Sequence, residues 1–446
     1  MQLEVIGVGG AGCRIADSIL DADPAEHSFV GDAFAFDTDA RSLRALSAIP
    51  DDHRHRYGGT VENGLNGNLQ RGDSVGEESV DELERQLDRG QPSIADAFLI
   101  AVGLGGATGG GTVPHLVATL QTMYDAPVYV LATLPAEREL EAPESDDGDP
   151  RAPNASGSGE GGVDGERVPP AGDGRAETHG IDDERVETND TGDERVEAAG
   201  TVGVGPGEST RPPDDDPTEE LEPEPTTRPL AEENATRTLE RLEGLANAIV
   251  CFDNERWLKS AEGLLEGRDR LNRELAARVA AFFGATADAS DGGTGPDAET
   301  VIDANDVGRI LGDGTDLVTL GYGEQRVEAE SGSRFGLGLF ATEPSVDTAA
   351  AVSAIETTVG KALRGKLTLE CDREHADRGM LVVGGPPEWL NRRAITDGRK
   401  TIESATGSVE ILGGDAPRPG TDLVYAVVVL AGIEPVERLE ERRNEA

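Results

Sequence analysis

Residues 97–112 read Ala97-Phe-Leu-Ile-Ala-Val-Gly-Leu-Gly-Gly-Ala-Thr-Gly-Gly-Gly-Thr112, a short apolar run followed by a cluster of glycines. The apolar run predicts a buried strand, and residues 113–123 continue with a helical pattern. Glycines between a strand and a helix let backbone N–H groups approach a ligand closely, and the helix dipole favours an anion there. The stretch therefore predicts a phosphate-binding loop at the end of a buried strand.

A second glycine cluster, Gly7-Val-Gly-Gly-Ala-Gly12, follows the apolar residues 3–8 in the same way. Alone it matches the G-x-G-x-x-G dinucleotide fingerprint, and Asp37 lies about 25 residues further on, where a ribose-binding acid is sought. A Rossmann-type, NAD-binding oxidoreductase is therefore an alternative. A dehydrogenase needs only one such loop, so two loops favour a protein that binds a nucleoside triphosphate. If both clusters were merely tight turns, so many glycines would be hard to explain.

Short apolar runs alternate with helical patterns in the first part of the chain, which predicts an α/β fold with a parallel sheet and helices on both faces. A long helical pattern at 264–283 has no evident strand partner. Residues 335–433 predict a second, α+β domain. Strands are expected at residues 3–8, 33–36, 97–102, 127–132 and 249–252, then at 336–340, 367–371, 380–383, 409–412 and 424–430. Later helices are expected at residues 235–246, 345–363 and 388–404.

The chain of 446 residues carries 87 acidic and 40 basic residues, a net charge of −47. Such a charge argues against nucleic acid as a partner, because phosphates would be repelled. Only four of the basic residues are lysine, and an acidic, lysine-poor surface suits molar salt, which screens self-repulsion. No apolar run is long enough for a membrane span, and we expect no signal peptide. Three cysteines without a CxxC spacing predict neither disulfides nor a metal site, and they fit a reducing cytoplasm.

Residues 142–228 differ from the rest of the chain in composition. They contain no Phe, Tyr, Trp or Lys, and they carry 25 acidic against 7 basic residues. The pentapeptide Asp-Glu-Arg-Val-Glu occurs at 183–187 and again at 193–197. A segment of this kind buries too little apolar surface to offset its ordering entropy. We therefore predict a disordered acidic insert.

The order of the motifs resembles the tubulin/FtsZ superfamily of cytoskeletal GTPases, and most of all its archaeal CetZ branch. Gly105-Gly-Ala-Thr-Gly-Gly-Gly111 is similar to the signature GGGTGTG of that superfamily. Its second nucleotide loop is similar to Phe36-Asp-Thr-Asp-Ala40, and its ribose loop to Thr133-Leu-Pro-Ala-Glu-Arg-Glu139. Its guanine-side motif is similar to Asp253-Asn-Glu-Arg-Trp-Leu258, and the start of its central helix to Leu271-Asn-Arg-Glu-Leu275. Two segments resemble the CetZ branch in particular, Val382-Val-Gly-Gly-Pro-Pro-Glu388 and Gly413-Gly-Asp-Ala-Pro417.

The resemblance implies GTP and Mg²⁺ as ligands, and self-association into head-to-tail filaments with a role in cell shape, division or motility. It implies a GTP-binding domain at 1–141 and 229–262, a central helix at 263–290, an acidic catalytic loop and connection at 291–334, the α+β domain at 335–433 and an exposed charged tail at 434–446. The implied GTP contacts are Gly9, Gly10, Ala11, Gly12, Cys13, Arg14, Asp37, Gly105, Gly106, Ala107, Thr108, Gly109, Gly110, Glu139, Asn254 and Asn272.

Ile302-Asp-Ala-Asn-Asp-Val307 resembles the acidic loop of the family. In the family these carboxylates enter the nucleotide site of the next subunit and orient the attacking water, so the resemblance implies catalytic roles for Asp303 and Asp306. Phosphoryl transfer suits such positioning of a water molecule. The structural alternative is that both residues cap the following helix, since Asp is a favoured N-cap.

Several positions depart from the family pattern. Ala107 replaces a signature glycine, Val301 stands where an asparagine usually precedes the acids, and Asp37 replaces an asparagine beside the nucleotide. A carboxylate there would repel phosphate unless Mg²⁺ is close or the carboxylate faces the ribose. The insert separates Glu139 from its expected arginine neighbour, for which Arg228 is the candidate. These departures keep a second alternative open, a filament regulator that binds GTP without hydrolysing it.

Overall fold

A computed structural model describes residues 1–25, 27–61, 64–140, 227–287, 300–312, 314, 316–328 and 346–440. These residues belong to one compact unit of the chain. Three predictions lie wholly or largely outside them: the disordered acidic insert, the strand at 336–340 and the end of the charged tail. Within the described residues, no helix has the length and apolar character needed to cross a bilayer.

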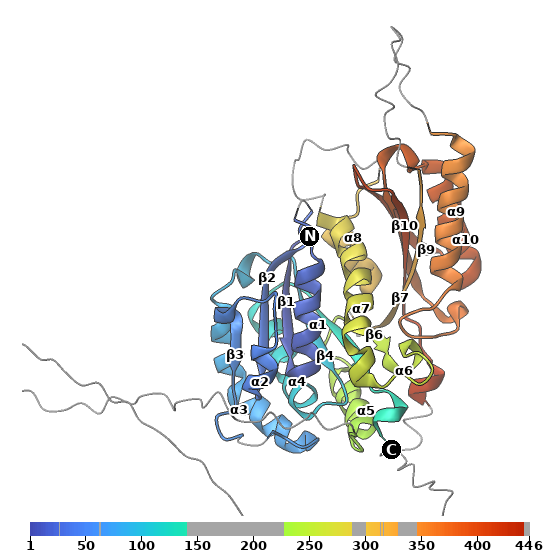
Figure 1. Ribbon diagram of the computed structural model, residues 1–446. Coiled ribbons are helices and arrows are strands. Elements are labelled where there is room, and N and C mark those ends of the chain that lie inside the picture. The colour runs from blue at the N-terminus through green and yellow to red at the C-terminus, as the bar shows by residue number, and fades with distance from the viewer. Residues whose placement is uncertain are drawn as a thin grey trace, which may run out of the picture. The chain divides into compact units, whose positions relative to one another are not determined.

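The described strands form one ten-stranded sheet in the order β3-β2-β1-β4-β5-β6-β7-β10-β8-β9 (Figure 1). Neighbouring strands from β3 to β7 are parallel, β10 is antiparallel to both β7 and β8, and β8 and β9 are parallel. The strands are β1 (Leu3–Val8), β2 (Val30–Asp37), β3 (Arg54–Arg56), β4 (Ala97–Gly103), β5 (Val128–Leu134), β6 (Ala248–Asp253), β7 (Asp316–Arg326), β8 (Arg378–Gly385), β9 (Glu410–Pro417) and β10 (Leu423–Ala431).

Helices cover both faces of this sheet, as the sequence predicts. The helices are α1 (Gly9–Ala22), α2 (Ala40–Arg44), α3 (Leu69–Leu87), α4 (Ala107–Met123), α5 (Ala231–Leu242), α6 (Asn254–Trp257), α7 (Leu264–Ala287), α8 (Ala304–Leu311), α9 (Thr348–Arg364) and α10 (Arg392–Thr406). Side chains of α3, α4, α5, α9 and α10 share one apolar core, and those of α1, α7 and α8 share the core on the other face. The parallel strands are buried on both faces, which explains their nearly continuous apolar sequences.

The long helix that lacked a strand partner is α7. Leu271, Leu275, Val279 and Phe283 recur every four residues and are all buried, so they form one apolar stripe. This stripe packs against α1 and also reaches strands of the mixed half of the sheet. The helix therefore joins the parallel half to the mixed half.

Two strand predictions in the second half of the chain differ from the structure. No strand is expected from the sequence at 316–326, where β7 lies, and one is expected at 367–371, where none forms. Leu367 and Leu369 are buried, which explains the apolar pattern. The Thr368 hydroxyl accepts a hydrogen bond from the Leu320 N–H at 2.9 Å. The segment at 367–371 is thus attached to β7 partly through a side chain, in place of the backbone hydrogen-bond ladder of a regular strand.

Residues 434–440, expected as an exposed helix or tail, are only partly exposed, and residues 437–440 are helical. Val436 and Leu439 are buried against the core. Arg438 pairs with Asp253 Oδ2 at 2.9 Å and donates a hydrogen bond to the Pro135 carbonyl oxygen at 2.9 Å. This segment therefore docks beside the ends of β5 and β6.

Candidate nucleotide site

The two glycine loops lie at the point where the strand order of the parallel half reverses. β1 and β4 are neighbours in the sheet, and the chain continues from β1 toward β2 on one side and from β4 toward β5 on the other. Ligands of open α/β sheets bind in the crevice at such a switch point, beyond the carboxyl ends of the strands. The strand ends in question lie at the lower end of Figure 1, near α5 and α6.

The first loop turns directly from β1 into α1 and lies against the second. Gly9 has φ +72°, and a Cβ at that residue would stand 2.9 Å from the Gly109 backbone nitrogen. At Gly12 a Cβ would overlap the carbonyl oxygen of Ala101 on β4. Glycine is therefore required at both positions, once for the backbone conformation and once for the close approach of α1 to the sheet.

The second loop runs through Gly103–Gly106 into α4. The N-cap of α1 is Val8 and that of α4 is Gly106, and neither side chain caps its helix. By contrast, side chains of Asp39, Asn68 and Asp253 cap α2, α3 and α6. The first N–H groups of α1 and α4 are thus left without a side-chain partner at the N-cap, as an anion site at a helix N-terminus requires.

Some glycines of the second cluster serve packing. A Cβ at Gly109 would stand 2.8 Å from the Val8 carbonyl oxygen, and one at Gly110 would stand 2.5 Å from Thr238 Oγ1 on α5. At Gly111 it would overlap the backbone of Gly72 on α3. Tight turns alone therefore do not explain the glycines of this cluster, because close packing of the helices also requires glycine at these positions.

A third loop, at the end of β2, meets the second through two hydroxyl groups. Thr38 Oγ1 and Thr108 Oγ1 are 3.1 Å apart and share a hydrogen bond. The sequence analysis did not select Thr38, although it lies within the quoted stretch 36–40. Asn234 of α5 was also missed, and its amide donates to the carbonyl oxygens of Gly67 (2.9 Å) and Gly105 (3.2 Å). No motif in the sequence points to that contact.

Asp37 is a buried acid beside the first loop. It is 3% exposed, and its Oδ1 accepts a hydrogen bond from the Asp39 N–H at 3.2 Å. Its Oδ2 is buried without a hydrogen-bond partner. A Cβ on Gly10 would stand 3.5 Å from both this Oδ2 and Arg14 Nη1, so an acid and a base flank Gly10. Burial raises the pKa of Asp37 from 3.8 to about 6, and the backbone N–H groups of Asp39 and Thr38 partly oppose that rise.

Other predicted contacts are less accessible in the structure. Cys13 is fully buried, and its Sγ donates weak hydrogen bonds to the carbonyl oxygens of Gly7 and Phe36, both at 3.4 Å. Burial raises the pKa of this thiol well above its ordinary value, so Cys13 is a packing residue and not a reactive thiol. Ala107 is 5% exposed and belongs to the apolar core, so its methyl group is largely withdrawn into the protein.

The two ends of the insert remain joined at the predicted ribose loop. The Arg228 N–H donates to the Glu139 carbonyl oxygen at 2.6 Å. Glu139 is 5% exposed, and its Oε1 accepts from the Ala136 N–H at 2.7 Å. Burial raises the pKa of Glu139, and the nearby charge of Arg228 opposes the rise. The predicted neighbour of Glu139 is therefore beside it in space despite the intervening segment.

The remaining predicted contacts lie farther along the same end of the sheet. Asn254 is the first residue of α6, directly after β6, and Asn272 lies on α7; both are partly buried. Among the described residues, no side-chain hydrogen bond links either asparagine to the glycine loops. No group of three His, Cys, Asp or Glu residues within these parts of the chain is arranged to hold a metal ion.

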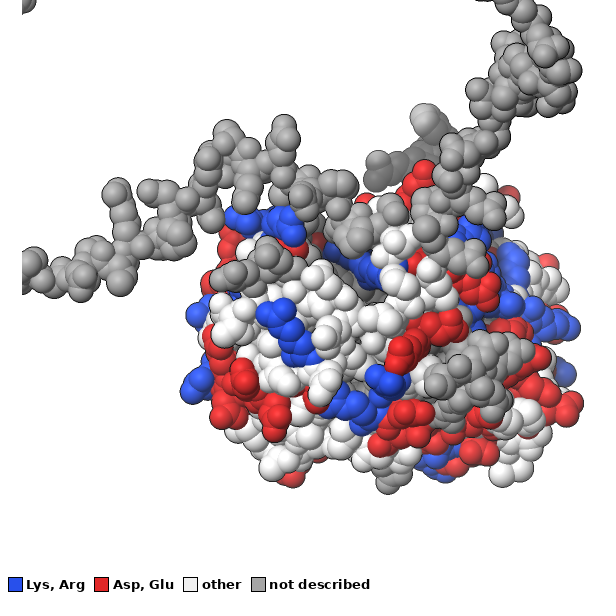
Figure 2. All heavy atoms as spheres, turned by 90° about the horizontal axis from the view of Figure 1, so that it is seen from below, with Lys and Arg blue, Asp and Glu red and all other residues white. Residues whose placement is uncertain are grey.

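Seen from this end, the middle of the molecular face is mostly uncharged (Figure 2). Acidic side chains gather toward its edges, with a few basic ones between them. A mostly uncharged face imposes less repulsion on an anionic ligand than the acidic edges would.

The two predicted catalytic acids lie at the opposite end of the sheet. They stand at the start of α8, which lies beside the N-terminus in Figure 1, away from α5 and α6. A Cβ on Gly308 of α8 would be 3.7 Å from the hydroxyl of Tyr129, which lies near the beginning of β5. The nucleotide loops follow the ends of the same parallel strands. One subunit therefore does not bring its own acids to its own loops.

Asp303 and Asp306 also cap α8, as the structural alternative predicted. Asp303 Oδ1 accepts from the Asp306 N–H at 2.9 Å, and Asp306 Oδ2 accepts from the Asp303 N–H at 3.4 Å. This reciprocal arrangement is a capping box. Capping does not exclude chemistry, because each carboxylate keeps an oxygen that takes no part in the box.

The chain matches two family models. The model described as Tubulin/FtsZ family, GTPase domain, matches residues 2–145, and the model described as tubulin-like CetZ, C-terminal domain, matches residues 261–446. Tubulin-like protein CetZ1 of Haloferax volcanii is 30% identical over 100% of this chain and 92% of its own length. A CetZ of Pyrococcus furiosus is 22% identical over 99% of this chain and 88% of its own length.

Solved structures agree with these relatives. The GDP-bound monomer of CetZ1 from Haloferax volcanii aligns with a TM-score of 0.68 at 27% identity, covering 100% of this chain and 98% of that chain. CetZ2 from the same organism, solved as a GTPγS-bound protofilament, shares the fold with a TM-score of 0.67 at 23% identity, covering 100% and 97%. The predicted fold class is confirmed, and the chain belongs to the CetZ family of tubulin-like proteins.

Proposed function

We propose that this protein is a cytoplasmic, filament-forming GTPase whose complete active site exists only between two subunits. One observation carries the proposal: the glycine loops and the acids Asp303 and Asp306 lie at opposite ends of one sheet. Subunits stacked head to tail would bring the acids of one to the loops of the next. Such a contact does not close on itself, so it produces filaments.

The first domain supplies the proposed nucleotide site. The two helix N-termini at α1 and α4 lack side-chain caps and so suit the phosphates, and the glycines at 9 and 12 allow the first loop to pack closely against the second loop and β4. Arg14 adds a positive charge on α1. CetZ1, which is 27% identical in its solved structure, was solved with GDP bound, and this supports a guanine nucleotide. Asn254, Asn272 and the Glu139 loop follow the neighbouring strands and are proposed for the nucleoside.

The chemistry proposed for the junction is attack of water on the terminal phosphate. Phosphoryl transfer depends on positioning and charge compensation more than on a covalent intermediate. Asp303 and Asp306 would orient the water. Mg²⁺ is the proposed companion ion, held mainly by the phosphates and its own waters, where it would compensate their charge.

The proposed role is cytoskeletal, in cell shape, division or motility. Its supports are the CetZ family and the geometry of the two ends. The domain boundaries expected from the sequence remain part of the proposal: residues 1–141 and 229–262 bind the nucleotide, 263–290 form the central helix, 291–334 carry the acids and 335–433 complete the fold. The buried free thiols of all three cysteines fit a reducing cytoplasm.

Binding of a fluorescent GTP analogue in molar KCl with Mg²⁺ tests the nucleotide assignment. We expect unlabelled GTP to compete and NAD⁺ to have no effect at millimolar concentration. Competition by NAD⁺ alone would instead support the Rossmann-type alternative, for which the G-x-G-x-x-G motif and Asp37 are the motivating residues. GTP binding without any phosphate release would support the non-hydrolysing regulator.

A further inference from the structure

Strand β9 holds the chain segment that leads into the proposed catalytic acids. Asp415 is 8% exposed, and its Oδ1 accepts a hydrogen bond from the Thr300 N–H at 2.7 Å. In return, the Asp415 N–H donates to the Thr300 carbonyl oxygen at 3.2 Å. Thr300 is thus fixed at both its backbone N–H and its backbone carbonyl by one residue of β9.

The neighbouring residue of β9 fixes the next part of the segment. Gly414 has no room for a side chain, because a Cβ would stand 2.5 Å from Ile302 Cγ1 and 2.6 Å from the Thr300 carbonyl oxygen. Ile302 is 3% exposed and packs in the core, whereas Val301 between the two contacts is 50% exposed. Asp303 follows immediately. The direction in which the chain enters α8 is therefore set by β9.

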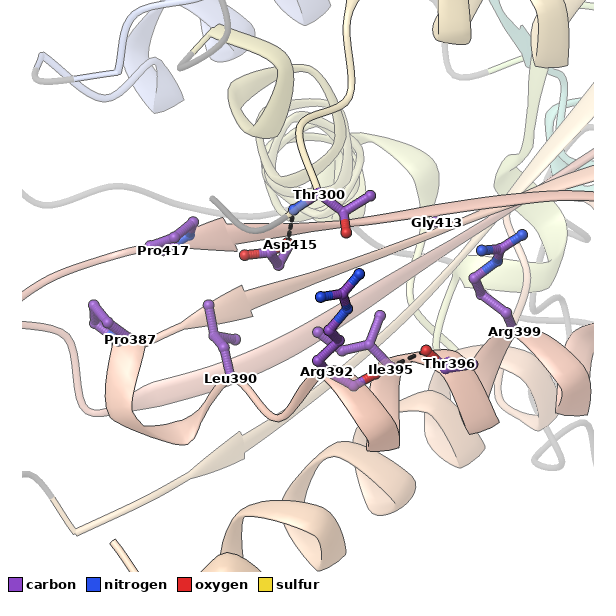
Figure 3. Close-up of a pocket in the computed structure, with 10 residues that line it drawn as sticks. All are labelled: Thr300, Pro387, Leu390, Arg392, Ile395, Thr396, Arg399, Gly413, Asp415 and Pro417. Atoms are coloured by element: carbon purple, nitrogen blue, oxygen red, sulfur yellow. Dashed lines mark hydrogen bonds between the residues drawn. The ribbon is translucent and has the colours of Figure 1, made fainter. Parts of the chain in front are cut away.

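Hydrogen bonds, and not packing, hold the Thr300 end of this segment. Thr300 is exposed, and both Thr300 and Asp415 line an open cavity of about 260 Å³ between β9 and α10. Figure 3 shows Thr300 and Asp415 joined by a hydrogen bond, with Arg392 below them and Arg399 farther to the right. Since space lies on one side of Thr300, loss of the Asp415 carboxylate would leave the Thr300 N–H without its partner, and only the backbone bond from the Asp415 N–H at 3.2 Å would still hold this residue to β9.

We propose that Asp415 is a positioning residue for hydrolysis: through its two hydrogen bonds to Thr300 it fixes the place of Asp303 and Asp306 relative to the nucleotide of the adjoining subunit. The inference rests on the proposed function. In this proposal Asp415 acts through the backbone of Thr300 and is not itself a catalytic group. Its effect falls on turnover, because a small misplacement of a catalytic group is costly whereas GTP binding uses the other end of the molecule.

Asp415→Ala should lower kcat for GTP by about tenfold and leave GTP affinity unchanged. Asp415→Asn keeps an Oδ1 acceptor for the Thr300 N–H, so its kcat should stay within about threefold of the wild type. Glu410→Gln is a matched control on the same strand. It removes an exposed ion pair with Arg309 (2.7 Å), a kind of pair that contributes little, so turnover should not change.

Mixing experiments separate positioning from general damage. Gly106→Asp supplies a subunit with intact acids and a blocked nucleotide site, since Asp is a favoured N-cap and its charge repels phosphate. Gly106 has φ −88°, and a Cβ there meets only the Gly103 carbonyl oxygen, at 3.5 Å, so the variant should fold. A 1:1 mixture with Asp415→Ala should recover roughly a quarter of wild-type turnover, because about one junction in four then pairs a bound nucleotide with intact acids.

The same mixture made with Asp303→Asn in place of Gly106→Asp should recover nothing, because both defects then lie at the acidic end. Recovery with Asp303→Asn, or wild-type kcat in Asp415→Ala, would overturn the role of Asp415 while leaving the proposed GTPase intact. Failure of Asp415→Ala to complement Gly106→Asp, together with a low kcat for Asp415→Asn, would show general damage and overturn it too. A wild-type protein without turnover would instead remove the proposed function on which the inference rests.

Discussion

Replacing Asp303 and Asp306 together by asparagine will lower GTP turnover by on the order of 10²- to 10⁴-fold and leave GTP binding unchanged. Asparagine caps helices as well as aspartate does, so the capping box at the start of α8 is retained. Only the negative charges and their proton-accepting capacity are lost. Phosphate release at saturating GTP, in molar KCl with Mg²⁺, measures the first effect, and a fluorescent GTP analogue measures the second.

Alanine at Asp303 is the informative comparison. It removes both the carboxylate and the cap, and the lost cap costs about 1 kcal/mol of stability. If the two acids served only as caps, the asparagine pair would behave as the wild type and the alanine variant alone would be impaired. Turnover of the asparagine pair within twofold of the wild type would therefore contradict a catalytic role.

Asp37→Asn will stabilise the folded protein at neutral pH, by up to about 3 kcal/mol. The pKa of the Asp37 carboxyl is about 6 in the folded chain against an ordinary value of 3.8, a difference of 6 − 3.8 = 2.2 pH units. Each unit corresponds to about 1.4 kcal/mol. Because the folded-state pKa is raised, the ionised form disfavours folding. The penalty is fully present above pH 6 and fades as the pH falls toward 4.

Denaturant unfolding at pH 7.5 and pH 4.5 measures this effect. The gain from Asp37→Asn should be largest at pH 7.5 and mostly lost at pH 4.5. Asp39→Asn is the control, since that carboxylate is 38% exposed, and its stability should change by less than about 0.5 kcal/mol. An equal gain from Asp37→Asn at both pH values would contradict the burial of an ionised carboxylate beside the first loop.

The parallel half of the sheet was predictable from the sequence, whereas β7 was not. Continuous apolar runs ending in glycine mark β1 and β4 because both faces of these strands are buried. In β7, Gly321 and Gly323 interrupt the pattern and resemble a turn. Both are needed because α9 lies so close that a Cβ would overlap the carbonyl oxygens of Ala362 and Thr358. That requirement becomes visible only once the helix is in place.

Helix α3 was not predicted from the sequence, for a related reason. Its buried face includes Gly72, Gly76 and Ser79, small residues that allow α4 to approach and give little apolar signal. The short run at 367–371 led to the opposite error, a strand prediction that is wrong, since its apolar side chains are buried although no strand forms there. The local sequence pattern indicates that a residue is buried, and it does not indicate which helix or strand buries it.

The candidate site was predictable in composition and not in geometry. The motifs identified the glycine loops, the loop at Asp37 and the acids at the start of α8. The full burial of Cys13, the hydroxyl contact between Thr38 and Thr108, and the contact between Arg228 and Glu139 depend on tertiary packing. So does the placement of loops and acids at opposite ends of the sheet, the feature on which the proposed shared active site rests.

GTP turnover measured against protein concentration tests that central claim most directly. If the site is completed by the adjoining subunit, turnover per subunit will be negligible below a threshold concentration and will rise steeply above it, in step with polymer detected by light scattering. A rate per subunit that stays constant at all concentrations would mean that each chain carries a complete site. That result would contradict the assignment of Asp303 and Asp306 to the nucleotide of the next subunit.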